Sequence, residues 1–145
     1  MMEEKTYSLV EVAGLLDIKL HRLREWINRG YIRPSLPSGR SGSRNFYNKA
    51  DLYNIKLFEC LVNQNIPRTT AQQLLTEATD PEKGSHLMIW TDSEGIFACE
   101  AWAKKGKGID IQVTIDNRYE IIVLVNLRWI RQDILKRLAR VDKKL

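Results

Sequence analysis

The sequence predicts an α+β protein in two small units: a helical unit, then a small antiparallel sheet with one closing helix. Up to about residue 78, apolar residues recur every three or four positions, as they do in helices. Beyond residue 86, short apolar runs separated by turn signals are typical of strands. Pro81 and Gly84 stand among polar residues between these patterns, as in a linker. The predicted division is therefore 1–78, 79–85 and 86–145.

A capping box opens the first predicted helix. Ser8 can accept a hydrogen bond from the Glu11 amide, and the Glu11 side chain can reach back to the Ser8 amide. The apolar stripe that follows predicts a helix over residues 9–16. A second helix is predicted over 19–29, and Gly30 can end it in the left-handed conformation. Two short helices joined by a tight turn form a helix-turn-helix.

The segment 33–44 breaks the helical pattern with two prolines and two glycines. Residues 34–36 and 45–47 are predicted to pair as two short strands around a basic loop, which forms a wing. Asn48 can cap a third helix, with Asp51 as its partner. A fourth helix is predicted over 69–78. The first unit is therefore predicted to be a winged helix-turn-helix of four helices and a two-strand wing.

The second unit is predicted to hold a four-stranded antiparallel sheet. The expected strands cover 86–91, 96–102, 109–115 and 119–126, and a closing helix covers 127–141. The apolar stripe of that helix is expected to cover one face of the sheet, because an apolar sheet face needs a cover. The alternative is a helix-to-helix dimer seam.

Positive charge is concentrated in the first unit. The net charge is +5 and the isoelectric point is about 9.3. Residues 18–49 hold eight basic residues against one acid, Glu25. A solvated surface could carry such a stretch, but the concentration favours a face that meets phosphates.

Five short motifs follow one another in order through the first half of the chain. They are residues 7–13, Leu23-Arg24-Glu25-Trp26, residues 30–34, Arg44-Asn45-Phe46-Tyr47 followed by Asp51-Leu52, and Asn65-Ile66. In this order and spacing they resemble the DNA-binding domain of the MerR family of bacterial regulators. Beyond residue 80 the family usually continues into a long dimerising coiled coil, whereas a sheet is predicted here, so the family's dimer and inducer do not transfer.

The resemblance implies that the second helix enters the major groove. The residues that it and the basic pattern assign to DNA binding are Lys19, His21, Arg22, Arg24, Trp26, Arg40, Arg44 and Tyr47. Lys19 is expected at a phosphate and Arg22 near base edges, while His21 could contact a base, a phosphate or only solvent. The resemblance gives Arg24 and Trp26 the role of backbone contacts, although Trp26 could equally be core. Arg40 and Arg44 are expected at a flanking phosphate or the minor groove.

Other classes of protein find little support. The longest apolar run, residues 121–125, is far too short to span a membrane, and no apolar signal segment opens the chain, so the cytoplasm is expected. Cys60 and Cys99 stand alone, without the ligand spacing of a metal site. We expect no cofactor, no metal and no enzymatic activity, since no catalytic arrangement of side chains is visible.

The sequence therefore predicts a sequence-specific transcriptional regulator that binds double-stranded DNA. A single unit of this size buries limited interface on DNA, so a homodimer is expected. The second unit is expected to serve dimerisation, or to bind a small molecule or protein effector. Two alternatives remain: an architectural or recombination accessory protein similar to phage excisionases, and a protein–protein interaction module.

Overall fold

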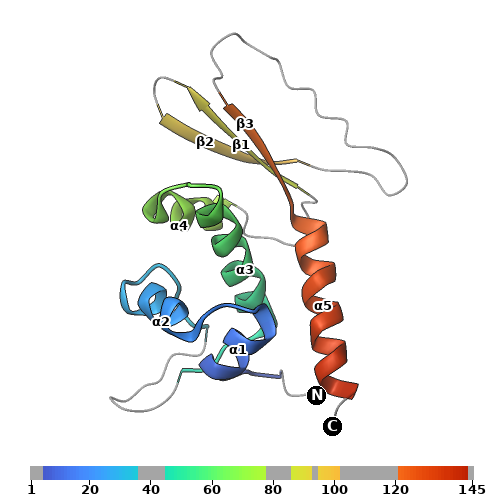
Figure 1. The fold of residues 1–145 in the computed structure, drawn as a ribbon. Coiled ribbons are helices and arrows are strands. Elements are labelled where there is room, and N and C mark those ends of the chain that lie inside the picture. Colours follow the sequence, from blue (N-terminus) through green and yellow to red (C-terminus); the bar gives the residue numbers. More distant parts are fainter. Residues whose placement is uncertain (1–4, 36–44, 78–85, 93–94, 102–120, 144–145) are drawn as a thin grey trace, which may run out of the picture.

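The structure is a computed structural model that describes residues 5–35, 45–77, 86–92, 95–101 and 121–143. These residues form five helices and three strands (Figure 1). The helices are α1 (Leu9–Leu16), α2 (Leu20–Asn28), α3 (Lys49–Asn63), α4 (Arg68–Glu77) and α5 (Leu127–Lys143). The strands are β1 (His86–Asp92), β2 (Gly95–Ala101) and β3 (Ile121–Asn126).

The predicted fold class is wrong in its four-stranded sheet. The described residues are mostly helical, and their three strands pair antiparallel in the order β2-β1-β3. The central strand β1 places Ile89 opposite Ala98 on one side and Val123 on the other. The third predicted strand, 109–115, lies outside the described residues. An alternating pattern indicates that a segment suits a strand, but not that a neighbouring strand is free to pair with it.

The predicted two-strand wing lies only partly within the described residues, so its pairing stays a prediction. Tyr47 pairs with Tyr7 in an isolated antiparallel bridge, in which the two amides donate to the opposite carbonyls at 2.8 and 2.9 Å. Pro34 and Ser35 belong to no strand, and Leu36 lies outside the described residues. Proline has no amide hydrogen, so Pro34 could not have donated to a ladder. The strand after the wing is therefore held by the start of the chain.

Two capping boxes set where helices begin. In α1, the Glu11 amide donates to Ser8 Oγ at 3.3 Å, and the Ser8 amide donates to Glu11 Oε1 at 3.2 Å. In α3, Asn48 and Asp51 exchange equivalent bonds at 2.9 and 3.0 Å. The predicted helix 9–16 is confirmed by α1. Gly30, with a φ of +79°, follows α2 as the sequence predicts.

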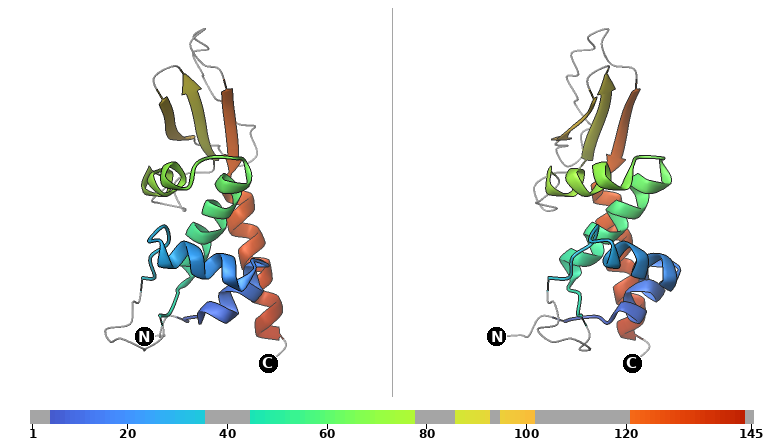
Figure 2. Two further views of the ribbon diagram at one scale, coloured as in Figure 1. Left: turned by 60° about the vertical axis from the view of Figure 1, so that its left-hand side comes forward. Right: turned by 90° about the vertical axis from the view of Figure 1, so that its left-hand side faces the viewer.

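The closing helix does not cover the sheet as expected. The views in Figure 2 show α5 running alongside α3 and reaching α1, while the sheet stands at the far end of the helices from α1. The buried residues of α5 belong to one core with those of α1, α2 and α3; they are Leu127, Ile130, Ile134 and Leu138. Helix α5 packs against both α1 and α3, so its apolar stripe is buried in the core that these helices share.

A side-chain contact fixes the end of this packing. Arg137 Nη1 donates to the Leu15 carbonyl at 2.9 Å, and its Nε donates to Asp133 Oδ2 at the same distance. The guanidinium therefore satisfies a carbonyl in the last turn of α1. The C-terminal helix is thus built into the helix-turn-helix unit. The predicted linker, residues 79–85, lies outside the described residues.

Two further findings bear on the classes of protein considered. No helix among the described residues is long and apolar enough to cross a membrane. Within the same ranges, no three His, Cys, Asp or Glu side chains are grouped so that they could hold a metal ion.

Candidate nucleic-acid interface

Helix α2 has a buried face and an exposed face. Leu23 and Trp26 are fully buried, whereas His21 and Arg24 are exposed. The Trp26 ring packs edge-on against Phe58 of α3, with ring centroids 5.0 Å apart. Its indole nitrogen is buried and has no hydrogen-bond partner among the described residues. Trp26 therefore lies in the core, which is the second of the two readings the sequence left open, and its N–H does not reach the surface.

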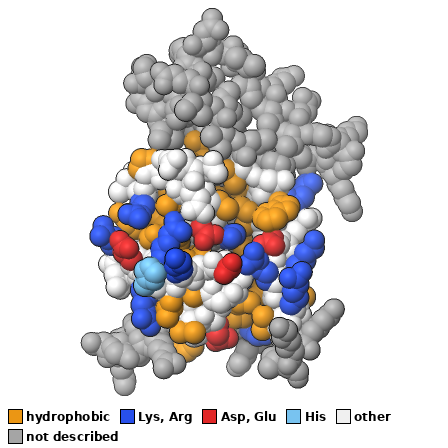
Figure 3. Space-filling model, viewed as in Figure 1, with side chains coloured by type: hydrophobic (Ala, Val, Ile, Leu, Met, Phe, Trp, Pro, Cys, Tyr) orange, Lys and Arg blue, Asp and Glu red, His pale blue; other side chains and the backbone are white. Residues whose placement is uncertain are grey.

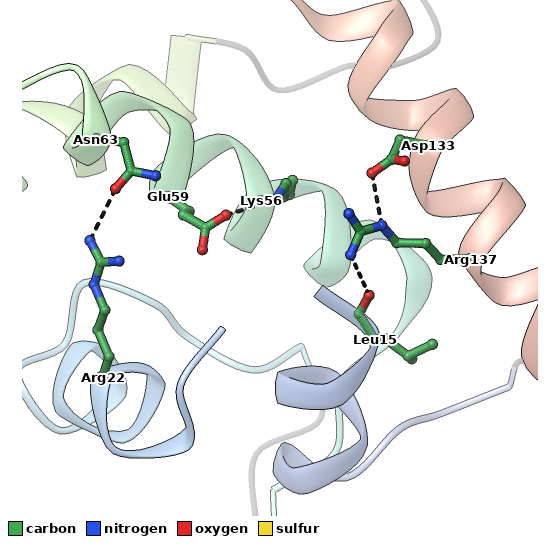
Figure 4. A network of polar contacts seen from close by, with 7 residues as sticks. All are labelled: Leu15, Arg22, Lys56, Glu59, Asn63, Asp133 and Arg137. Carbon is green, nitrogen blue, oxygen red and sulfur yellow. Dashed lines mark hydrogen bonds and ion pairs between the residues drawn. The ribbon is translucent and has the colours of Figure 1, made fainter. Parts of the chain in front are cut away.

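Arg22 lies on the flank of α2 that faces α3 (Figure 4). Its Nη2 donates to Asn63 Oδ1 at 3.2 Å, and its Cζ lies 4.7 Å from the centroid of the Trp26 ring. A guanidinium has five N–H donors, so these contacts leave others available to a ligand. The Trp26 ring thus packs against the Arg22 guanidinium, and the hydrogen bond to Asn63 fixes the direction of that guanidinium.

A cleft of about 600 Å³ lies on the other flank of α2, and we call it the wing-side cleft. It is lined by Ser8, Leu9, Val10, Arg24, Ile27, Asn28, Asn45 and Tyr47. The start of α1, the outer face of α2 and the strand after the wing each contribute one wall. A helix N-terminus carries partial positive charge from its free amides, and Arg24 adds a full charge. The cleft therefore has the chemistry to receive an anion such as a phosphate.

Tyr47 forms a wall of this cleft, but its side chain is almost fully buried, with 1% exposed. Burial raises the pKa of its hydroxyl, which is therefore neutral at physiological pH. The backbone bridge to Tyr7 fixes the residue in place. Its position supports the shape of the cleft more than a direct charge-bearing contact.

Asp51 joins the two ends of the predicted wing. Its carboxylate accepts hydrogen bonds from the Ser35 amide at 3.1 Å and from the Ser35 hydroxyl at 2.6 Å. The same group accepts from the Asn48 amide at 3.0 Å, and the residue is only 5% exposed. Sequence reasoning found Asp51 only as a cap partner. The bond to Ser35 spans 16 positions, and no local pattern signals it.

The other predicted site residues divide into two groups. His21 is exposed in the first turn of α2, and Lys19 is exposed as its N-cap residue. Arg40 and Arg44 lie outside the described residues. The cleft also contains polar residues that the sequence analysis missed, Asn28 and Asn45. Asn28 stands four positions after Arg24, so helical spacing could have found it.

Basic side chains gather at two places on the face shown in Figure 3, over α2 and along α5. The surface over α2 also carries acid, because Glu25 forms an ion pair with Arg29 at 3.2 Å. That pair is exposed and neutralises Arg29 locally, so it adds little net attraction for phosphates. The charge available to a polyanion on α2 therefore comes from Lys19, Arg22 and Arg24.

Comparison with known proteins identifies this half of the chain. Residues 7–78 match the family model described as MerR HTH family regulatory protein. The matched range runs from the Tyr7 bridge to the end of α4, and so includes every residue that lines the wing-side cleft. No curated protein matches the chain.

Proposed function

We propose that the protein is a sequence-specific transcriptional regulator that binds DNA, because residues 7–78 match the family model of MerR HTH family regulatory proteins. In this proposal α2 enters the major groove of duplex DNA. The observation that carries it is the exposed side of α2, where His21 and Arg24 are exposed and Arg24 lines the wing-side cleft. Lys19, the N-cap residue of α2, is exposed as well.

The side chains have separate roles in this proposal. Arg22 and His21 read base edges, because they stand near the N-terminal end of the helix that enters the groove. Arg24 contacts a phosphate at the wing-side cleft, where the start of α1 adds partial positive charge. Lys19 contacts a phosphate beside it, and Arg40 and Arg44 of the wing reach the flanking backbone or minor groove.

The protein acts as a homodimer on a pseudo-palindromic site in this proposal, since one unit of this size covers a single half-site. Its place of action is the cytoplasm, where its DNA is found. The residues after 80 form the part of the chain that dimerises or receives an effector.

Selection from a random duplex DNA library at near-physiological salt tests the proposal. We expect enrichment of one inverted repeat, whose half-site spacing gives the geometry of the dimer. Arg22→Ala is then expected to relax sequence preference, whereas Arg44→Ala weakens binding to all duplexes alike. Equal effects of both changes on every sequence would refute this division of roles.

A matched pair of variants separates the interface from general charge. Arg24→Ala is expected to weaken DNA binding and to reduce the slope of log affinity against log salt by about one. Lys136→Ala removes one positive charge from an exposed position of α5 and is expected to change neither quantity appreciably. Salt-dependent binding without an enriched motif would favour the excisionase-like architectural role. Weak, salt-insensitive binding would favour the protein-interaction module.

A further inference from the structure

A second cleft, of about 520 Å³, lies between α1 and the last turns of α5, and we call it the C-terminal cleft. It is lined by Lys5, Tyr7, Glu11, Gly14, Leu15, Arg137, Arg140 and Val141. Tyr7, Leu15 and Val141 provide apolar surface, and Val141 is 41% exposed. The volume falls within the range of small-molecule sites, which are mostly apolar with a few placed polar groups.

Gly14 leaves space in the C-terminal cleft, but it lowers the helix stability of α1. Glycine inside a helix is less favourable than alanine by about 1 kcal/mol. No close contact requires it here, because a Cβ added at Gly14 would meet no atom within 4 Å. Its φ is not positive either, unlike that of Gly30. The exposed glycine therefore leaves a space beside α1 that no described neighbour fills, and this space is open to a ligand.

The charges around the cleft select for a negative occupant. Lys5, Arg137 and Arg140 are basic, against the single acid Glu11. The Glu11 carboxylate is engaged by the Ser8 amide in the capping box. Arg137 is held in place by Asp133 and the Leu15 carbonyl (Figure 4), which leaves further N–H donors on its guanidinium. Among the described residues, Arg140 has no ion-pair partner and is exposed.

We propose that the C-terminal cleft binds a small amphipathic anion, an apolar body that carries a carboxylate or sulfonate. The apolar body packs over Gly14 against Leu15 and Val141, and the anionic group is bound by Arg140 with support from Arg137. The occupant bridges α1 to α5, so it joins the helix-turn-helix to the C-terminal end of the chain. This site is distinct from the wing-side cleft, with which it shares no residue.

Fluorescence titration with anilinonaphthalene sulfonate, an aromatic sulfonate, tests the proposal on the full chain without DNA. We expect saturable binding to the native protein, and weaker binding of the uncharged analogue phenylnaphthylamine. Arg140→Glu should weaken sulfonate binding by roughly tenfold or more, because it replaces a charge-assisted contact by repulsion. Lys136→Glu makes the same charge change on the same helix outside the cleft, and should alter the affinity by less than about twofold.

Gly14→Leu is the filling variant and should abolish saturable binding, with a thermal melt to establish that it is folded. Amide chemical shifts provide a second readout that does not depend on this variant. They should change around Gly14 of α1 and around Arg137 and Arg140 of α5 when the probe is added. The proposal is overturned if the probe does not saturate, if Arg140→Glu and Lys136→Glu weaken it equally, or if the shifts concentrate on α2 and Asn45 instead.

Discussion

Residues of α1 line two clefts, and the two clefts differ in the chemistry of their other lining residues. The wing-side cleft is walled by the first residues of α1, by α2 and by Asn45, so backbone amides and Arg24 stand close together. The C-terminal cleft runs along the middle of α1, where Gly14 leaves an apolar floor between cationic side chains. The paired backbones of Tyr7 and Tyr47 lie between them, since Tyr7 lines one cleft and Tyr47 the other.

Positive charge alone does not determine which kind of ligand a cleft binds. Arginines line both clefts, but a phosphate in a polymer stays hydrated and needs donors on an open surface. An amphipathic anion needs an apolar floor beside its charge. The same helix serves both surfaces because its N-terminal turn and its middle face different neighbours. A variant that damages one cleft and spares the other is therefore the way to test their independence.

The largest effect is expected from a substitution in the buried core that supports both clefts. Trp26→Ala takes a fully buried ring away from Phe58 and should lower the free energy of unfolding by about 3–5 kcal/mol. Chemical denaturation measures this, and DNA binding and probe binding should be lost together. Trp26→Phe is the control, and should cost far less because the indole N–H that it removes has no partner. Loss of DNA binding at unchanged stability would instead make Trp26 a surface contact.

The next largest effect is expected from a substitution that disturbs only the wing-side cleft. Asp51→Ala removes a buried carboxylate that binds Ser35 and Asn48, and should lower the free energy of unfolding by about 2–3 kcal/mol. Because both ends of the predicted wing lose their anchor, DNA affinity should fall further than the loss of folded protein explains.

Two measurements at a temperature where the Asp51→Ala variant is folded test that independence. DNA affinity by anisotropy should drop, while the sulfonate affinity of the C-terminal cleft stays as in the native protein. A parallel fall of both affinities would mean that Asp51 supports the whole unit and that the clefts are not separable. An unchanged DNA affinity would remove the wing from the interface.

Sequence reasoning succeeded where the determining contacts are local. Ser8 with Glu11 and Asn48 with Asp51 act over three positions, and both capping boxes were predictable for that reason. The exposed position of Arg24 on α2 followed from helical spacing in the same way.

It failed where distant segments decide. The bridge from Tyr7 to Tyr47 joins two segments far apart in the sequence, and α5 is buried against α1 and α3 instead of its own sheet. Arg137 reaches the Leu15 carbonyl across 122 positions, a contact that no periodicity can indicate. The C-terminal cleft is created by that packing, and so it was not predictable from the sequence alone.

A smaller effect concerns the wall of the wing-side cleft formed by α1. Ser8→Ala removes the hydroxyl oxygen that accepts a hydrogen bond from the Glu11 amide, and should lower the free energy of unfolding by about 1 kcal/mol. Fraying of the first turn should also weaken DNA binding, because that turn lines the wing-side cleft. Ser8→Asp keeps a capping acceptor but adds negative charge, so it should retain stability and still weaken DNA binding. Equal DNA affinity for Ser8→Asp and the native protein would place the phosphate away from α1.

The smallest effect has the opposite sign and tests the floor of the C-terminal cleft. Gly14→Ala should raise the free energy of unfolding by about 0.5–1 kcal/mol, because alanine favours the helix and its Cβ meets no neighbour. The added methyl group takes space from the occupant, so sulfonate affinity should fall while DNA affinity holds. Denaturation and the two titrations, made on one preparation, measure all three quantities. If Gly14→Ala lost stability, the space over Gly14 would be filled by the protein itself. A gain of stability with weaker sulfonate binding would mean that Gly14 costs α1 helix stability and that this cost keeps the C-terminal cleft open.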